Sequence, residues 1–169
     1  TKKTIHAAVQ VVDIGGLVEG ASKGEGLGNK FLANIREVDA IVLVLRAFID
    51  SDVTGPDDPL EHLRIVELEL ALADLETVDS RLQRVQKAAR VDKGVAEEVA
   101  ILQRAHDILN SGVPIYRSEM SAADREVLAP HFLLTNRRVL AVINVGENEL
   151  DRIPELEARV RAEIAPPGA

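Results

Sequence analysis

A short motif near the start of the chain combines a carboxylate and glycine in a spacing suited to phosphate chemistry. Asp13-Ile14-Gly15-Gly16 follows an apolar stretch and fits the pattern Asp-x-x-Gly. At the end of a strand, Asp13 could hold Mg²⁺ through water, and the bare N–H of Gly16 could reach a terminal phosphate. The same pattern also occurs at ordinary turns, so the motif alone leaves both interpretations open.

A second motif lies far along the chain and could recognise a base. Asn144-Val145-Gly146-Glu147 follows another apolar stretch. It resembles the Asn-Lys-x-Asp motif of GTPases, with Val145 in place of Lys and Glu147 in place of Asp. Asp accepts hydrogen bonds from N1–H and the N2 amine of guanine, whereas the longer Glu147 would crowd that base. We therefore expect strict selection of guanine to be lost, although Asn and Gly are also common turn residues.

The strands that must position these motifs follow from the hydrophobic pattern. Apolar segments at residues 4–12, 40–45 and 139–145 predict three strands. The near-continuous run at 40–45 is typical of a parallel strand that is covered on both faces. Helical segments alternate with the strands, which favours a parallel α/β sheet with its ligands at the carboxyl ends of the strands.

The segment after Leu60 changes to a heptad pattern, which predicts a helical hairpin. The apolar positions of its first helix are Leu68, Ala71, Leu75, Val78, Leu82, Val85 and Ala89. After a break at 91–94, a similar spacing resumes at Val95, Val99, Leu102, His106 and Leu109. Two such helices joined by a short turn form an antiparallel hairpin, which we interpret as an insertion. Further helices are expected over residues 29–38, from Ser121 onward, and over 154–164.

Composition narrows the classes of function. The net charge of −8 argues against general binding of nucleic acid, because neutralising phosphates requires clustered Lys and Arg. The sequence also holds no direct signal for DNA binding. The absence of cysteine excludes disulfides, thiolate metal sites and a Cys nucleophile. The four histidines show no metal-ligand spacing. No apolar run is long enough to span a membrane, so we expect a cytoplasmic protein.

The glycine-rich stretch at residues 13–32 resembles the switch region of the Obg-like ATPase family, the YchF branch of the Obg-related P-loop NTPases. The resemblance continues over residues 33–41, 70–78, 133–135 and 144–147. It implies a P-loop core, an inserted coiled-coil arm and a later TGS domain. It also implies hydrolysis of ATP in preference to GTP with Mg²⁺, and association with the ribosome, on its large subunit.

The resemblance also implies roles for individual residues. Asp13 would be the Mg²⁺ ligand, through water, and Gly16 would donate to the γ-phosphate. Leu17 would stand where many GTPases have the catalytic Gln, so another group must orient the attacking water. At the other end of the nucleotide, Asn144, Val145 and Glu147 would contact the base.

The chain departs from the family pattern in several ways. The phosphate-binding loop Gly-x-x-x-x-Gly-Lys-[Ser/Thr] does not occur in the sequence. No clear switch threonine precedes Asp13, where Thr4 is only a candidate, and the loop after Phe48 holds no histidine. Ser22 and Lys23 could face phosphate or be exposed turn residues. We therefore expect a fragment that lacks the P-loop and the TGS domain of a longer protein.

These observations predict an α/β fold with a partial, mostly parallel P-loop NTPase-like sheet and an inserted antiparallel α-helical hairpin. The expected division is a nucleotide-binding core at 1–58 and 131–169, and a helical arm at 59–130. Two alternatives to an ATPase remain. The chain could be a non-catalytic interaction module, or a degenerate NTPase, because it lacks the phosphate-binding loop; and it could favour GTP, against which Glu147 argues.

Overall fold

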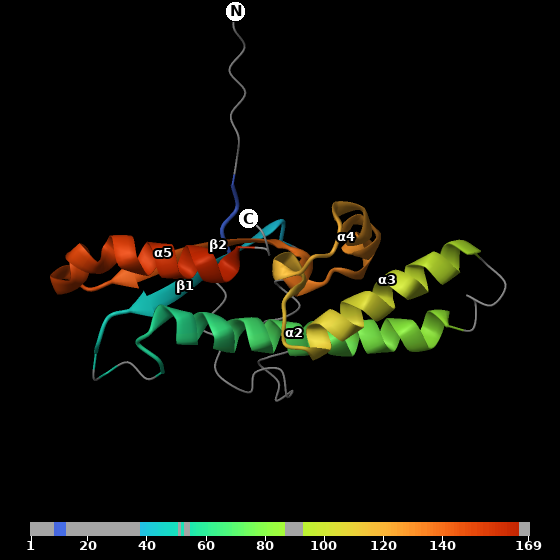
Figure 1. Cartoon of the computed structure of the whole chain (residues 1–169), viewed down its shortest axis with the longest axis horizontal. Helices are drawn as coiled ribbons and strands as arrows, with labels where there is room; N and C mark the ends of the chain where they lie inside the picture. The colour runs from blue at the N-terminus through green and yellow to red at the C-terminus, as the bar shows by residue number, and fades with distance from the viewer. Residues whose placement is uncertain (1–8, 13–37, 51, 53–54, 87–92, 166–169) are drawn as a thin grey trace, which may run out of the picture.

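The computed structural model describes residues 9–12, 38–50, 52, 55–86 and 93–165. Its two strands are β1 (Ala40–Ala47) and β2 (Arg138–Val145). Its α-helices are α2 (Pro59–Val85), α3 (Lys93–Asn110), α4 (Ala122–Leu128) and α5 (Ile153–Ile164). Short 3₁₀ turns lie at η3 (Ile115–Arg117), η4 (Ala129–His131), η5 (Leu134–Asn136) and η6 (Glu147–Arg152). Figure 1 shows the whole arrangement.

The two strands pair in parallel, with Ala40 opposite Arg138 and Ala47 opposite Val145. The helical hairpin lies between them in the sequence, as Figure 1 shows, so a small parallel sheet and helices form the predicted α/β fold. Because the strands are parallel and end in register, the residues that follow both of them lie at one edge of the sheet.

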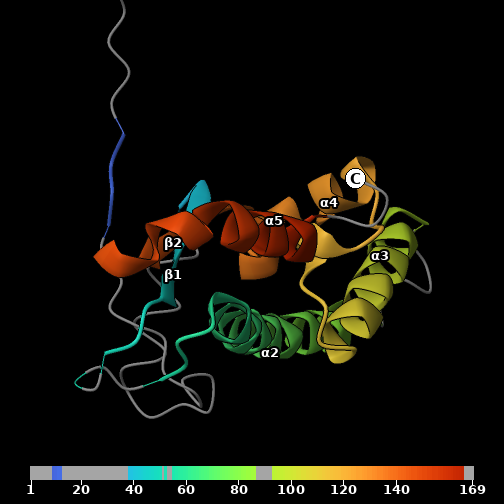
Figure 2. The same cartoon turned by 60° about the vertical axis from the view of Figure 1, so that its left-hand side comes forward.

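Helices α2 and α5 cover the same face of this sheet. Buried side chains of β1 pack with the first half of α2 and with α5, and the inward-facing residues of β2 join them: the buried members are Ile41, Leu43, Leu45, Leu63, Val66, Leu70, Ala73, Leu134 and Val160. Figure 2 shows α2 and α5 as neighbouring layers beside the strands. Each buried aliphatic side chain in such a core contributes roughly 1.5–3 kcal/mol.

The opposite face of the sheet is uncovered by the described residues. Val42, Val44, Leu140 and Val142 are 43–59% exposed. The described residues therefore cover only one face of β1, and covering of the other face stays a prediction for the rest of the chain. Among the described α-helices, α2 and α5 pack against the sheet, and both lie on its covered face.

The strand predicted at 4–12 is not present in residues 9–12, the part of this segment that the structure describes. Residues 9–12 carry no strand, and Val9 and Val11 are both 86% exposed. Among the described residues β1 pairs only with β2, so this segment has no neighbour to complete a ladder. The first part of the predicted strand lies outside the described residues, as does the predicted helix at 29–38 apart from Val38, which is not helical.

Helix α2 begins at a cap that is visible in the sequence. Asp58 accepts a hydrogen bond from the Leu60 N–H at 2.7 Å, and Pro59 occupies the first turn, where its missing N–H costs nothing. Arg159 of α5 donates to the same carboxylate at 2.9 Å. One side chain thus fixes both the start of α2 and its position against α5.

The second half of α2 forms the hairpin with α3. A cluster along the two helices buries Ala71, Val78, Leu82 and Val85 against Ile101, Leu102, Ala105 and Leu109. Arg81 and Glu98 pair across the hairpin at 2.8 Å. The predicted seam is thus present from Ala71 to Val85, whereas Leu68 is 48% exposed and Ala89 lies outside the described residues. The seam starts late because the preceding turns of α2 face the sheet instead of α3.

Within the described residues, no helix combines the length and the apolar character that crossing a membrane requires.

Candidate functional site: the carboxyl edge of the sheet

The end of β2 carries two uncommitted polar side chains. Asn144 is the penultimate residue of β2, and Glu147 begins the 3₁₀ turn η6 directly after it. Both side chains are exposed, and neither makes a hydrogen bond or ion pair with another described residue. An amide and a carboxylate at a sheet's carboxyl edge are therefore available to a ligand. Val145 between them is half-buried.

The turn after β2 packs closely against the residue that follows β1. A Cβ at Gly146 would lie 3.4 Å from the Cβ of Phe48 and 3.6 Å from an Oε of Glu149. Phe48 is half-buried, and its ring faces the guanidinium of Arg46 with 5.8 Å from Cζ to the ring centroid. Phe48 therefore lies next to the turn between Asn144 and Glu147, and an aromatic ring offers a surface on which a planar base could stack.

Arg46 is held in place by the loop after β1. Its Nε donates to the Pro56 carbonyl at 3.0 Å, and a terminal nitrogen donates to the Gly55 carbonyl. The Arg46 backbone N–H donates to Nδ1 of His62, in the first turn of α2, at 3.3 Å. Burial and the charge of Arg46 both lower the pKa of His62, so its ring is neutral at pH 7.

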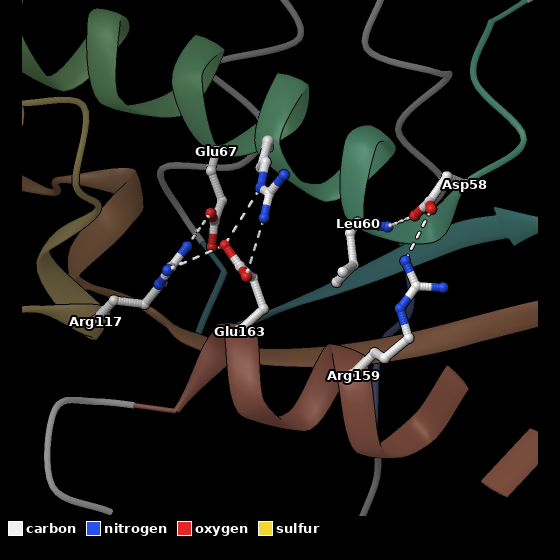
Figure 3. A network of polar contacts seen from close by, with 7 residues as sticks. Asp58, Leu60, Glu67, Arg117, Arg159 and Glu163 are labelled. Carbon is white, nitrogen blue, oxygen red and sulfur yellow. Dashed lines mark hydrogen bonds and ion pairs between the residues drawn. The ribbon is translucent and has the colours of Figure 1, made fainter. Parts of the chain in front are cut away.

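A polar network, drawn in Figure 3, joins helices α2 and α5 away from this edge, toward the amino ends of the strands. Glu67 is 3% exposed; it pairs with Arg117 at 2.6 Å and accepts from the Tyr116 hydroxyl. Burial raises the pKa of Glu67 against the opposing effect of these two partners. Glu163 of α5 forms ion pairs with Arg64 and Arg117, each with an N–O distance of 3.3 Å. The hydrogen bond that Arg64 donates lowers the pKa of Glu163.

The structure places only part of the predicted site. Asn144, Val145 and Glu147 lie together at the carboxyl edge, beside the end of β1. Asp13, Gly16 and Leu17, which were expected at the phosphate end, lie outside the described residues. The same holds for Thr4, Ser22 and Lys23. No group of three or more acidic or histidine side chains in the described part of the chain could hold a metal ion.

Sequence reasoning missed the contributions of Phe48, Arg46 and His62. Phe48 was available as a signal, because it is the first residue after β1 and such residues lie at the ligand-binding edge. His62 is half-buried in the first turn of α2. Its contact with Arg46 depends on how α2 returns to the strand, which no local pattern records.

Comparisons with known proteins agree with the resemblance in the sequence. Residues 1–145 match the family model described as 50S ribosome-binding GTPase. The chain is 44% identical over 153 residues to the ribosome-binding ATPase YchF of Bacillus subtilis, covering 88% of this chain and 42% of that protein. It is 38% identical over 175 residues to the ribosome-binding ATPase YchF of Haemophilus influenzae, covering 98% and 48%.

A solved structure extends the similarity to three dimensions. The structure of the Schizosaccharomyces pombe YchF GTPase matches with a TM-score of 0.68 and 32% identity, over 92% of this chain and 44% of that one. Obg-like ATPase 1 of Oryza sativa subsp. indica is 35% identical over 170 residues, covering 95% of this chain and 43% of that protein. The chain thus spans less than half the length of these relatives.

Proposed function

Because the chain belongs to the Obg-like ATPase (YchF) family of P-loop NTPases, a family of nucleotide hydrolases, we propose that it supplies the base-binding half of an ATP site. Asn144 and Glu147 contact the adenine, Val145 lies between them, and Phe48 offers its ring from the neighbouring strand. The observation that carries this proposal is the parallel register, which brings the carboxyl ends of β1 and β2 to one edge of the sheet. At that edge the side chains of Asn144 and Glu147 are exposed and make no hydrogen bond or ion pair with a described residue.

The phosphate end of the site belongs to the switch residues in this proposal. Asp13 holds Mg²⁺ through water, Gly16 donates its N–H to the γ-phosphate, and Leu17 occupies the position of the catalytic Gln. Mg²⁺ supplies charge neutralisation between the phosphates when it is bound. Leucine cannot orient a water molecule by hydrogen bonding, so its role is to close an apolar side of the site.

The helical arm has a separate role in the proposal. We assign residues 1–58 and 131–169 to the nucleotide-binding core and 59–130 to the arm. The relatives named ribosome-binding ATPase support a ribosomal partner for the whole protein, in the cytoplasm, and the hairpin is the element that projects away from the sheet (Figure 1). The ATP state of the core would then order or release the switch and change how the arm is presented.

Titration of the isotope-labelled chain with Mg²⁺-ATP tests the base site directly. The side-chain amide of Asn144 should shift on binding. Asn144→Ala should weaken binding about tenfold, as expected for one lost hydrogen bond of about 1.4 kcal/mol. Asn148→Ala is the matched control, because the Asn148 side chain is exposed in η6 and makes no hydrogen bond with a described residue. Equal affinities of the two variants would refute the assignment.

The choice between adenine and guanine depends on Glu147. Glu147→Asp shortens the side chain by one methylene and restores the carboxylate position that accepts from guanine N1–H and N2. We expect the ratio of GTP to ATP affinity to rise in this variant, measured by competition against a fluorescent nucleotide. Preference for GTP in the unaltered protein would show that Glu147 does not exclude guanine.

A second candidate is a non-catalytic interaction module. It is favoured by the hairpin's own hydrophobic cluster, which is distinct from the cluster on the sheet. Calorimetry separates the two candidates. Tight, Mg²⁺-dependent binding of ATP by this chain would exclude the module, whereas the module predicts no heat of binding.

A further inference from the structure

A cavity of about 360 Å³ opens at the amino end of β2, opposite the carboxyl edge discussed above. Its walls come from η3, α4, the residues at the start of β2, and the end of α5. The lining side chains are Tyr116, Arg125, Arg137, Arg138, Val139 and Ile164. Half of them are arginines and none is acidic. A volume of this size suits a small organic molecule.

Arg125 is held in a fixed orientation toward the start of β2. Its Nε donates to Oδ1 of Asn136 at 2.9 Å, and a terminal nitrogen donates to the Asn136 carbonyl at 3.1 Å. The Asn136 amide donates back to the Arg125 carbonyl at 2.9 Å. These contacts use two of the five N–H donors of a guanidinium, so three remain for a ligand. The partner is a neutral amide and leaves the positive charge of Arg125 uncompensated.

The other arginines add to this charge. Arg138 is exposed and makes no ion pair with a described residue, and the guanidinium of Arg137 lies 5.8 Å from the centroid of the Phe132 ring. Glu67 holds the Tyr116 hydroxyl but is itself paired with Arg117 at 2.6 Å. Three arginines around one cavity concentrate positive charge in a chain whose net charge is −8.

We propose that this cavity binds a small phosphorylated molecule, with its phosphate held by Arg125, Arg137 and Arg138 and its body against Val139 and Ile164. A guanidinium group can donate two parallel hydrogen bonds to two oxygens of one phosphate. Several arginines together can balance a group that carries more than one negative charge. The apolar wall gives the cavity a place for the rest of the molecule, which an anion alone would not need.

This site is separate from the proposed base site. Arg138 begins β2 and Asn144 is six residues further on, which places them roughly 20 Å apart at about 3.3 Å per residue. The two sites therefore share a strand but no side chain. Binding here goes beyond nucleotide recognition at the carboxyl edge and does not depend on it.

Pyrophosphate is a suitable probe, added to the isotope-labelled chain at constant ionic strength so that screening does not change. The Arg125 Nε–H and the backbone amides of Val139 and Ile164 should shift, and those of residues 144–147 should not. Arg138→Ala should weaken the interaction about tenfold, the loss of one charged contact of about 1.4 kcal/mol. Arg84→Ala is the matched control, since Arg84 is exposed on α2 and makes no ion pair with a described residue.

Three results would overturn the proposal. Arg138→Ala and Arg84→Ala could weaken pyrophosphate equally, which would indicate general attraction to charge. Shifts confined to residues 144–147 would place the probe at the other edge. Succinate binding as tightly as pyrophosphate, or a single-stranded oligonucleotide binding more tightly, would exclude a small phosphorylated ligand as the preferred occupant.

Discussion

His62 connects the first turn of α2 to the end of β1 through a single ring nitrogen. Nδ1 accepts from the Arg46 N–H at 3.3 Å, so the ring proton resides on Nε2 and the neutral form is the one that fits. Burial and then the charge of Arg46 hold the pKa of His62 below its ordinary value of 6.5. Burial also lowers the pKa of His131.

These histidines predict a loss of stability in mild acid. A histidine with a lowered folded pKa binds protons better when unfolded, so its contribution is complete above about pH 6.5 and is lost as pH falls below that value. Urea unfolding should therefore give a smaller free energy at about pH 5.5 than at about pH 7.5. His62→Gln keeps an acceptor for Arg46 but cannot titrate, and it should reduce the difference.

The same experiment contains its own checks. His62→Gln combined with His131→Gln should flatten the profile further than either change alone. Glu67, whose pKa is raised by burial, acts in the opposite direction but equally in all these proteins. An unchanged slope in His62→Gln would show that the histidine does not titrate with folding.

Single residues were predictable where the neighbouring sequence determines their surroundings. Asn144 and Glu147 lie at the end of the apolar run that predicts a strand at 139–145; Asn144 is the penultimate residue of β2, Glu147 begins the turn after it, and both are exposed. His62 and Arg46 are 16 residues apart, and their contact requires the return of α2 to the strand. No periodicity in the sequence encodes that return, so this part of the site could not be predicted.

At the scale of elements, Asp74 joins helix α2 to the turn that leads into β2. Asp74 is fully buried and accepts hydrogen bonds from the Leu134 N–H at 2.8 Å, the Thr135 N–H at 2.7 Å and the Thr135 hydroxyl at 2.7 Å. The turn η5 therefore obtains its hydrogen bonds from a helix 60 residues earlier in the chain. This contact sets where β2 starts relative to the hairpin.

Replacing Asp74 should be among the most damaging single changes. Asp74→Ala leaves three buried donors without an acceptor, and we expect a loss of about 3–5 kcal/mol in the free energy of unfolding. Thr135→Val removes only the hydroxyl, keeps both amide contacts, and should cost about 1 kcal/mol. Urea unfolding followed by far-ultraviolet circular dichroism measures both; similar small losses would contradict this role for Asp74.

Heptad spacing was sufficient to predict the hairpin but not the point where its seam begins. Helix α2 buries Leu63, Val66 and Leu70 against the sheet and then Ala71, Val78 and Leu82 against α3. The apolar positions of both faces overlap in one sequence, so Leu68 was assigned to the seam although it faces solvent. Asp74 is buried but does not occupy an apolar position of the heptad pattern, so the pattern does not predict its burial.

At the scale of the whole molecule, the described residues cover the sheet on one side and leave its other side exposed. Alternate residues of both strands, beginning with Ile41 and Val139, pack against α2 and α5. The residues between them form a continuous apolar surface on the outer face: Val42, Val44, Leu140 and Val142. Parallel sheets in proteins are normally covered on both faces. An exposed surface of this kind binds apolar dyes and favours self-association.

Substituting two of these valines tests whether that face meets water in this chain. Val42→Thr with Val44→Thr keeps the shape and the β-branching of the strand, so stability should change little while binding of the dye anilinonaphthalene sulfonate falls by about half or more. Leu43→Thr, between them on the covered face, places a hydroxyl in the core and should cost about 2 kcal/mol or more. If the outer pair destabilises the protein as strongly as Leu43→Thr, then the outer face is covered in solution, and residues 13–37 are the nearest part of the sequence that could cover it.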